Sequence, residues 1–202
     1  MAKNQLEQLK DRLNRNGFQT QLCGSAEEAR DKALAIIGTK SVGFGSSMTV
    51  NQLGIYDALS AKGNQVYWHW KSEATDALFR AAANAEVYLC SVNAVTEAGD
   101  LINIDKTGNR VANTFYGPKE VVLIVGRNKL CKDIAAGIDR IKNVVCPLNT
   151  ARLNAKTPCR LTGKCADCNS PERICRTIVI LQRPSAAVEH VHVLLVDEDL
   201  GY

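Results

Sequence analysis

The stretch K-S-V-G-F-G-S-S-M-T-V, residues 40–50, decides the fold of this chain. Its first part is short, apolar and interrupted by glycines, which predicts a buried strand over Lys40–Gly45. Its hydroxyl-rich second part leads directly into a predicted helix near Val50–Ala61. A strand that passes through a glycine turn into a helix is the repeating unit of α/β proteins.

The segments on both sides repeat this alternation. Leucines at helical spacing predict a first helix, and Ser25 with Glu28 forms a capping box that opens a second one. The predicted helices are Asn4–Asn16, the one that follows Ser25, and Glu73–Ala83; the predicted strands are Gln65–Trp70 and Glu86–Ser91. We therefore expect an α/β fold with a mostly parallel sheet flanked by helices.

The second half of the chain changes character. Alternating residues and the turn T-G-N predict a β-hairpin insertion made by Gly99–Asp105 and Arg110–Phe115. After it we expect a strand at Glu120–Val125, a helix at Asp133–Ile141, and strands at Thr177–Leu181 and Val191–Val196 that rejoin the sheet.

Composition limits the class of protein. The 202 residues suit a single domain, 1–202, and the net charge of +4 is spread along the chain without a Lys/Arg block. With only 5% aromatic residues, the chain is not expected to bind nucleic acid. No apolar run is long enough to span a bilayer, and residues 1–16 do not resemble a signal peptide. These features predict a soluble cytoplasmic protein.

A cysteine-rich loop, residues 157–176, holds four of the eight cysteines at C-x5-C-x2-C-x6-C spacing. Such a loop is unusually long unless a ligand orders it. We predict a metal or iron–sulfur site whose ligands are Cys159, Cys165, Cys168 and Cys175. The spacing matches neither the paired zinc knuckles nor the ferredoxin pattern, so zinc and an iron–sulfur cluster both remain open. Free thiols are an alternative, and disulfides fit a chain without a leader poorly.

A first candidate ligand site lies at the glycine turn. Gly43 and Gly45 allow close backbone approach, and the amides and hydroxyls at the helix start favour an anion. The donors there are Ser46, Ser47, Met48 and Thr49. The turn is neither a Walker loop nor a dinucleotide-binding motif. Packing alone is the other interpretation of these glycines.

A second candidate site follows the strand at Glu86–Ser91. We expect Glu97 as general acid or base beside Arg110 as anion clamp, because ligands bind at the carboxyl ends of parallel strands. Further candidate ligand residues are Asn93, Asn103, Asn109, Lys119 and Lys129. A polar hairpin whose Asn and Asp residues make turns would explain much of this segment without any ligand.

Five motifs together resemble one known family. They are G-F-G-S-S-M-T (43–49), N-A-V-T-E-A-G-D-L-I-N-I-D (93–105), Y-G-P-K (116–119), V-G-R-N-K (125–129) and H-V-L-L-V-D-E-D-L-G-Y (192–202). The chain is similar along nearly its whole length to the LUD-domain, or DUF162, family of lactate-utilisation proteins. The cysteine motif P-C-x-x-T-G-x-C-x-D-C-x-S-P-E-R-I-C resembles that of a short, single-domain branch of the family.

The resemblance implies the fold shared by glucosamine-phosphate deaminases, ribose-phosphate isomerases and CoA transferases (the NagB/RpiA/CoA transferase-like fold). It also implies an accessory or redox role in oxidising L-lactate to pyruvate, with a small acid as ligand and iron–sulfur partner subunits. Asn93 stands where the related isomerases have a catalytic Asp, which argues against isomerase chemistry. A sugar-phosphate enzyme or sensor and a non-catalytic docking module remain the alternatives. A homo-oligomer is compatible with this fold.

Overall fold

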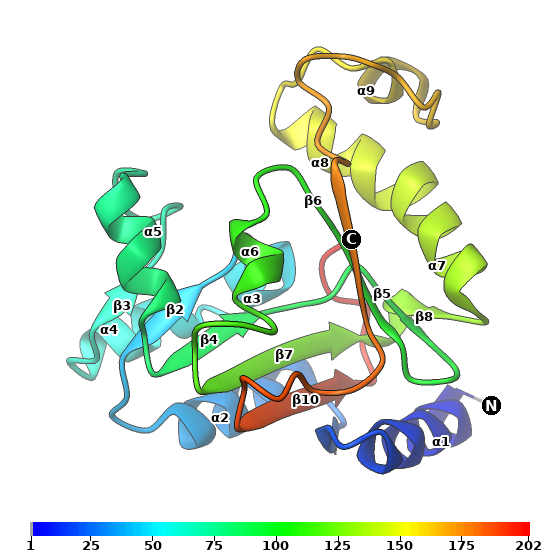
Figure 1. Ribbon diagram of the computed structural model, residues 1–202. Helices are drawn as coiled ribbons and strands as arrows, with labels where there is room; N and C mark the ends of the chain where they lie inside the picture. The colour runs from blue at the N-terminus through cyan, green and yellow to red at the C-terminus, as the bar shows by residue number, and fades with distance from the viewer. Residues whose placement is uncertain (1) are drawn as a thin grey trace.

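The computed structural model describes the backbone of residues 2–202 and the side chains of residues 4–202; Met1, the first residue of the predicted domain, lies outside it. Figure 1 shows two sheets with helices packed around them. The larger sheet is parallel throughout and carries helices on both faces. The predicted α/β class with a mostly parallel sheet is confirmed.

The larger sheet has six strands in the order β1-β10-β7-β4-β2-β3. Their bounds are Gln19–Cys23 (β1), Val42–Phe44 (β2), Val66–Tyr67 (β3), Val87–Cys90 (β4), Glu120–Gly126 (β7) and His190–Val196 (β10). The predicted strand at Lys40–Gly45 is observed as β2, which is shorter and lies between β4 and the edge strand β3. Because the strands are parallel, their carboxyl ends lie along one edge of the sheet, where ligands bind in open α/β folds.

Strand β7 explains why the core strands are apolar without interruption. Val122 and Ile124 pack on one face, against helix α2 (Ala26–Ile37) and its neighbours, whereas Val121 and Leu123 pack on the other. Successive side chains of a strand point to opposite faces, so a strand that is covered on both sides needs apolar residues at every position. Helix α1 (Ala2–Arg15) and the smaller sheet cover the second face.

The smaller sheet has the order β8-β5-β6-β9, made by Leu130–Cys131 (β8), Ala94–Thr96 (β5), Leu101–Asp105 (β6) and Thr177–Leu181 (β9). The predicted hairpin partner Arg110–Phe115 is wrong: β6 pairs antiparallel with β5, and residues 109–112 form a short helix, α6. Strand β9 was expected to rejoin the main sheet, but it pairs with β6 instead. Both differences arise from tertiary pairing, which local patterns do not encode.

The helices are Ala2–Arg15 (α1), Ala26–Ile37 (α2), Met48–Gln52 (α3), Ile55–Ala61 (α4), Asp76–Ala83 (α5), Asn109–Ala112 (α6), Ile134–Arg140 (α7), Cys146–Arg152 (α8) and Pro158–Thr162 (α9). The predicted cap is confirmed, because the Ser25 hydroxyl accepts the Glu28 amide proton at the start of α2. The single helix predicted after the glycine turn is divided into α3 and α4 by Gly54, whose φ is 61°. The cysteine-rich loop contains α9, which was not predicted.

Helix α7 continues through a π-helical segment, η2 (Ile141–Val145), directly into α8. Pro147 lies at the start of α8. A proline within a helix has no amide proton and its ring crowds the preceding turn, so the helix must widen or kink there. The widened turn places Val145 and Cys146 in the core beneath the second sheet.

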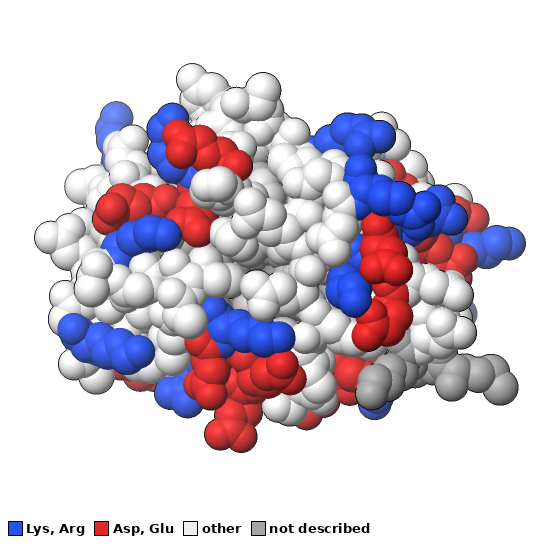
Figure 2. All heavy atoms as spheres, turned by 90° about the horizontal axis from the view of Figure 1, so that it is seen from below, with Lys and Arg blue, Asp and Glu red and all other residues white. Residues whose placement is uncertain are grey.

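The surface carries charges of both signs. Figure 2 shows lysine, arginine and carboxylate side chains interspersed over one face of the molecule. On that face, the arrangement agrees with a net charge that is spread along the chain without a Lys/Arg block. Within the described residues, no helix combines the length and apolar character needed to cross a membrane.

Candidate functional site

A cavity of about 350 Å³ lies where the carboxyl ends of the central strands meet the second sheet and the long helical stretch 134–152. Ser46 follows β2, Ser91 follows β4 and Lys129 follows β7, so three neighbouring strands supply its polar wall. Such an edge is where parallel sheets bind ligands. A volume in this range suits a small molecule.

Lys129 is a buried lysine in the wall of this cavity. Its side chain is 3% exposed, and its ammonium donates to Thr49 Oγ1 and Ser91 Oγ, both at 2.7 Å. Both acceptors are hydroxyl groups, and neither is a carboxylate. Burial, together with the nearby charges of Arg140 and Arg110, lowers the pKa of Lys129 to about 7.

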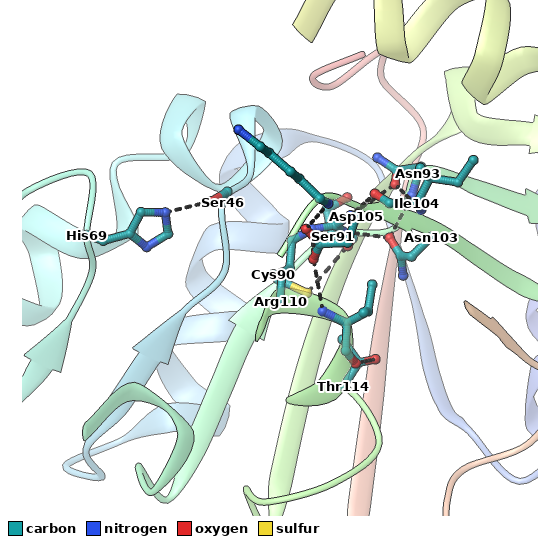
Figure 3. A network of polar contacts seen from close by, with 12 residues as sticks. Ser46, His69, Cys90, Ser91, Asn93, Asn103, Ile104, Asp105, Arg110 and Thr114 are labelled. Atoms are coloured by element: carbon teal, nitrogen blue, oxygen red, sulfur yellow. Dashed lines mark hydrogen bonds and ion pairs between the residues drawn. The ribbon is translucent and has the colours of Figure 1, made fainter. Parts of the chain in front are cut away.

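Arg110 is held by a network around the loop after β4 (Figure 3). Its guanidinium donates to Asn103 Oδ1 at 2.6 Å, Asn93 Oδ1 at 3.1 Å and the Ile104 carbonyl at 2.7 Å. Asp105 lies 3.7 Å from its Nε. With its donors occupied in this way, Arg110 ties β6 to the end of β4 and adds positive charge beside the cavity.

Ser46 and His69 form a second polar pair at the cavity, seen on the other side of Figure 3. Ser46 Oγ lies 2.8 Å from His69 Nε2, within hydrogen-bond distance. Burial lowers the pKa of His69, against a smaller opposite effect from Asp105, so the imidazole is neutral at pH 7. A neutral imidazole at this distance can accept a proton from or through the Ser46 hydroxyl.

The structure brings most of the predicted ligand residues to one cavity. Those that line it are Ser46, Ser47, Met48, Thr49, Asn93, Asn109, Arg110 and Lys129. Asn103 does not line it and instead accepts from Arg110. The two motifs that were predicted as separate sites thus form a single site.

The glycines of the turn serve close packing. A Cβ on Gly43 would lie 2.1 Å from the Ala82 carbonyl oxygen of α5, and one on Gly45 would lie 2.7 Å from Cys90 Cβ. These are contacts with the protein itself, so each glycine is needed whether or not a ligand binds. Their role as ligand residues has no support from this geometry.

Two other predicted residues lie away from the cavity. Glu97 is exposed in the turn between β5 and β6, and the carboxylate that faces Arg110 is Asp105 instead. Lys119 pairs with Glu189 at 3.0 Å, at the amino-terminal end of β7. The cavity lies at the opposite end of the strands.

The four predicted metal ligands, Cys159, Cys165, Cys168 and Cys175, are all partly exposed thiols around α9 and the loop after it. Among the residues that the structure describes, no three His, Cys, Asp or Glu side chains are grouped closely enough to hold one metal ion. A fifth thiol, Cys146, is buried beside them, in the same apolar cluster as Cys175.

Several residues of the site were missed by sequence reasoning. His69 and Trp70 line the cavity from the segment after β3, and Tyr202 reaches it from the end of the chain. The only local signal for His69 was its place in the W-H-W run at the end of the predicted strand Gln65–Trp70; the observed strand, β3, already ends at Tyr67. Cys146 carried no signal, because it stands well apart from the cysteine motif in the sequence.

Comparisons with known proteins agree with this fold. A solved structure of a DUF162 family protein from Deinococcus radiodurans is similar, with a TM-score of 0.59 and 14% identity over 97% of this chain and 98% of that one. No curated protein matches significantly. The sequence model of the LUD domain matches residues 6–196. The chain therefore belongs to the LUD-domain family.

Proposed function

We propose that this protein binds a small hydroxy- or keto-acid in the cavity beside Lys129 and acts as an accessory or redox subunit in the oxidation of L-lactate to pyruvate. Its family is linked to lactate utilisation in general. The observation that carries the proposal is a buried lysine at the cavity wall whose ammonium donates hydrogen bonds to two hydroxyl groups.

The charge balance around the cavity favours an anion. Lys129, Arg110 and Arg140 lie near one another, since both arginines lower the lysine pKa, and among the described residues the ion pair of Arg110 is with Asp105. Burying a cation without a counter-ion is costly unless a ligand provides one. A carboxylate at Lys129 would supply that charge and accept the third ammonium proton.

The same cavity offers a proton acceptor. Oxidation of lactate to pyruvate releases two electrons and two protons, one proton from the hydroxyl and one from Cα. Neutral His69 can take the hydroxyl proton through Ser46. The Cα proton would pass to solvent, and the two electrons would pass one at a time to iron–sulfur centres, carried by this chain or by partner subunits. Glu97, which lies outside the cavity, has no part in this scheme.

Binding of pyruvate and L-lactate, measured by calorimetry, tests the proposal. A hydrogen bond to a charged group contributes about 1.5–3 kcal/mol, so Lys129→Met should weaken binding roughly 10- to 150-fold. Lys119→Met is the matched control, because this exposed lysine lies at the other end of β7 and should not affect binding. Equal effects of the two substitutions, or no binding of either acid by the wild type, would refute the proposal.

A sugar phosphate is the second candidate ligand, because Ser46, Ser47 and Thr49 of the glycine turn line the cavity. All three hydroxyls already have partners, however: Ser46 lies 2.8 Å from His69 Nε2, Ser47 caps the Val50 amide, and Thr49 binds Leu200 O and Lys129. Ribose 5-phosphate in the same calorimetric assay separates the two classes. Tight binding of the phosphate without binding of the acids would replace the present proposal by this one.

We also propose that the cysteine-rich loop holds a metal or iron–sulfur centre, as its spacing predicts. The backbone supports a preformed ligand turn: Asp167, at a positive φ of 43°, donates its amide proton to Cys165 Sγ at 3.4 Å. Such amide–sulfur bonds stabilise a thiolate that binds metal. If the metal in this loop only stabilises the fold of a docking module without catalysis, Cys165→Ser will lower the stability of the protein and leave acid binding unchanged.

A further inference from the structure

The cavity beside Lys129 is larger than pyruvate or lactate requires. Its volume is about 350 Å³. Each of these acids has six heavy atoms, and even at the roughly 30 Å³ that one water molecule takes in the liquid, six atoms would fill only about half of the cavity. The other half is left for water or for a further part of the ligand, and the side chains that line it distinguish these cases.

The cavity follows one face of the helical stretch 134–152. The lining residues of this stretch recur every three or four positions, so they share a helix face. They include Ile141, Val145, Asn149 and Arg152. From Ile141 to Arg152 this face extends about 16 Å, at the 1.5 Å rise per residue of a helix. Arg140, at the start of the face, donates to the Asn128 carbonyl at 3.0 Å, next to Lys129. The cavity therefore reaches well beyond Lys129.

The end of the cavity at Arg152 is aromatic. The Arg152 guanidinium lies 4.6 Å from the centroid of the Trp70 ring, so helix α8 meets the segment after β3 there. His69 and Phe79 line the same end, with 5.1 Å between their ring centroids. Behind Trp70, the buried Trp68 ring stacks on it at 5.3 Å and fixes it to the core. Such a group of rings binds another ring favourably, by offset or edge-to-face contact.

Apolar side chains complete this end. Val145 and Ile174 are buried in its wall. Leu153 lines the cavity from the end of α8, although 48% of its surface is exposed. Water would find few hydrogen-bond partners among these side chains, whereas an apolar group of a ligand would cover Leu153 and gain from the hydrophobic effect.

The donors of Arg152 argue against a second anion site at this end. Its Nε and Nη2 both donate to Asn149 Oδ1, at 3.1 and 2.8 Å. The arginine side chain is also exposed, where an ion pair contributes little. Its planar group covers Trp70 and holds α8 against the aromatic end.

The polar groups of the cavity connect Lys129 to this aromatic end. Thr49 binds the Lys129 ammonium, and Ser46, three residues earlier, lies 2.8 Å from His69. Figure 3 shows His69 on the opposite side of Ser46 from the network around Arg110. Passing from Lys129 along the cavity, a ligand would therefore meet first a cation, then hydroxyl groups and an imidazole, and finally aromatic rings.

We propose that the cavity binds a 2-hydroxy or 2-oxo acid with an aromatic side chain. The carboxylate lies at Lys129, the 2-oxygen near Ser46, and the ring against Trp70 and Phe79. This inference rests on the acid-binding site proposed above and names the class of acid that fills it.

Calorimetry on the full chain with phenylpyruvate and pyruvate tests the inference. Burial of the phenyl ring should make phenylpyruvate bind about 10- to 150-fold more tightly than pyruvate. Phe79→Ala removes one ring from the aromatic end and should lower this preference about 2- to 10-fold. Tyr116→Ala is the matched control, because this ring is 71% exposed and does not line the cavity.

Circular dichroism checks that Phe79→Ala is folded, and Phe79→Leu, which also removes the ring, replaces it if it is not. Equal affinities of the wild type for phenylpyruvate and pyruvate, or a folded Phe79 variant that keeps the full preference, would overturn the inference. Tighter binding of 2-oxoadipate than of phenylpyruvate would also overturn it, in favour of a second anion at Arg152.

Lys129→Met separates this inference from the proposed function. If it weakens pyruvate binding while the wild type shows no preference for phenylpyruvate, the acid site stands and only the aromatic side chain is refuted. If binding of neither acid depends on Lys129, the acid site itself is refuted, and the inference that rests on it fails as well.

Discussion

The affinity for a small acid should depend steeply on pH because Lys129 must be protonated to bind a carboxylate. In the free protein its pKa is about 7. Half of the lysine is then charged at pH 7, and about one-hundredth at pH 9. The dissociation constant for pyruvate should therefore rise about 50-fold between these pH values, because the bound carboxylate keeps Lys129 protonated in the complex up to pH 9. Pyruvate itself stays ionised throughout.

The groups that face Lys129 leave this pH window clear. Burial raises the pKa of the Cys90 thiol to about 11, so this thiol stays protonated in the window. The pKa of His69 is lowered from 6.5 by burial, so it titrates below the window. Only Lys129 among these groups changes charge between pH 7 and 9.

Calorimetry in buffers of different ionisation enthalpy measures both the affinity and the protons taken up. Wild type should take up close to one proton per pyruvate at pH 9, as the lysine is recharged on binding. Lys129→Met should bind weakly and show no proton uptake. A wild-type affinity that does not change from pH 7 to 9, without proton uptake, would show that Lys129 does not hold the acid.

Three substitutions test the fold that positions the site, each by urea unfolding. Gly43→Ala should destabilise by about 1–3 kcal/mol or more, since its Cβ would collide with a backbone carbonyl of α5; wild-type stability would show that the sheet and helix can separate there. Although burial opposes ionisation of Glu120, hydrogen bonds from Lys40 and His192 lower its pKa. Its carboxylate therefore stabilises the fold above pH 4.5 and loses this effect as pH falls through the lowered pKa, so Glu120→Gln should flatten the acid limb of the stability profile, and an unchanged limb would contradict the assignment. Ser25→Ala should cost about 1 kcal/mol through loss of the α2 cap, and no loss would mean that the cap is dispensable.

Local sequence patterns predicted much of the fold correctly. The run Val121–Val125 is apolar at every position because both faces of β7 are covered, and Ser25 with Glu28 marks the start of α2. These signals act over a few residues, so they survive in any tertiary arrangement. The predicted hairpin strand at Arg110–Phe115 is wrong because pairing between strands depends on partners outside the local sequence. In the structure, β6 pairs with β5 instead.

For the site, the sequence alone determined which chemical groups were present: a hydroxyl-rich turn, an amide-rich segment, basic strand ends and a cysteine cluster. Tertiary structure decided which of them meet. It joined the turn and the amide-rich segment in one cavity, brought in His69, and left Glu97 outside. It also placed Cys146 against the cysteine-rich loop. Such contacts depend on how strands and helices that are far apart in the sequence pack together. Residue spacing along the chain does not predict this packing.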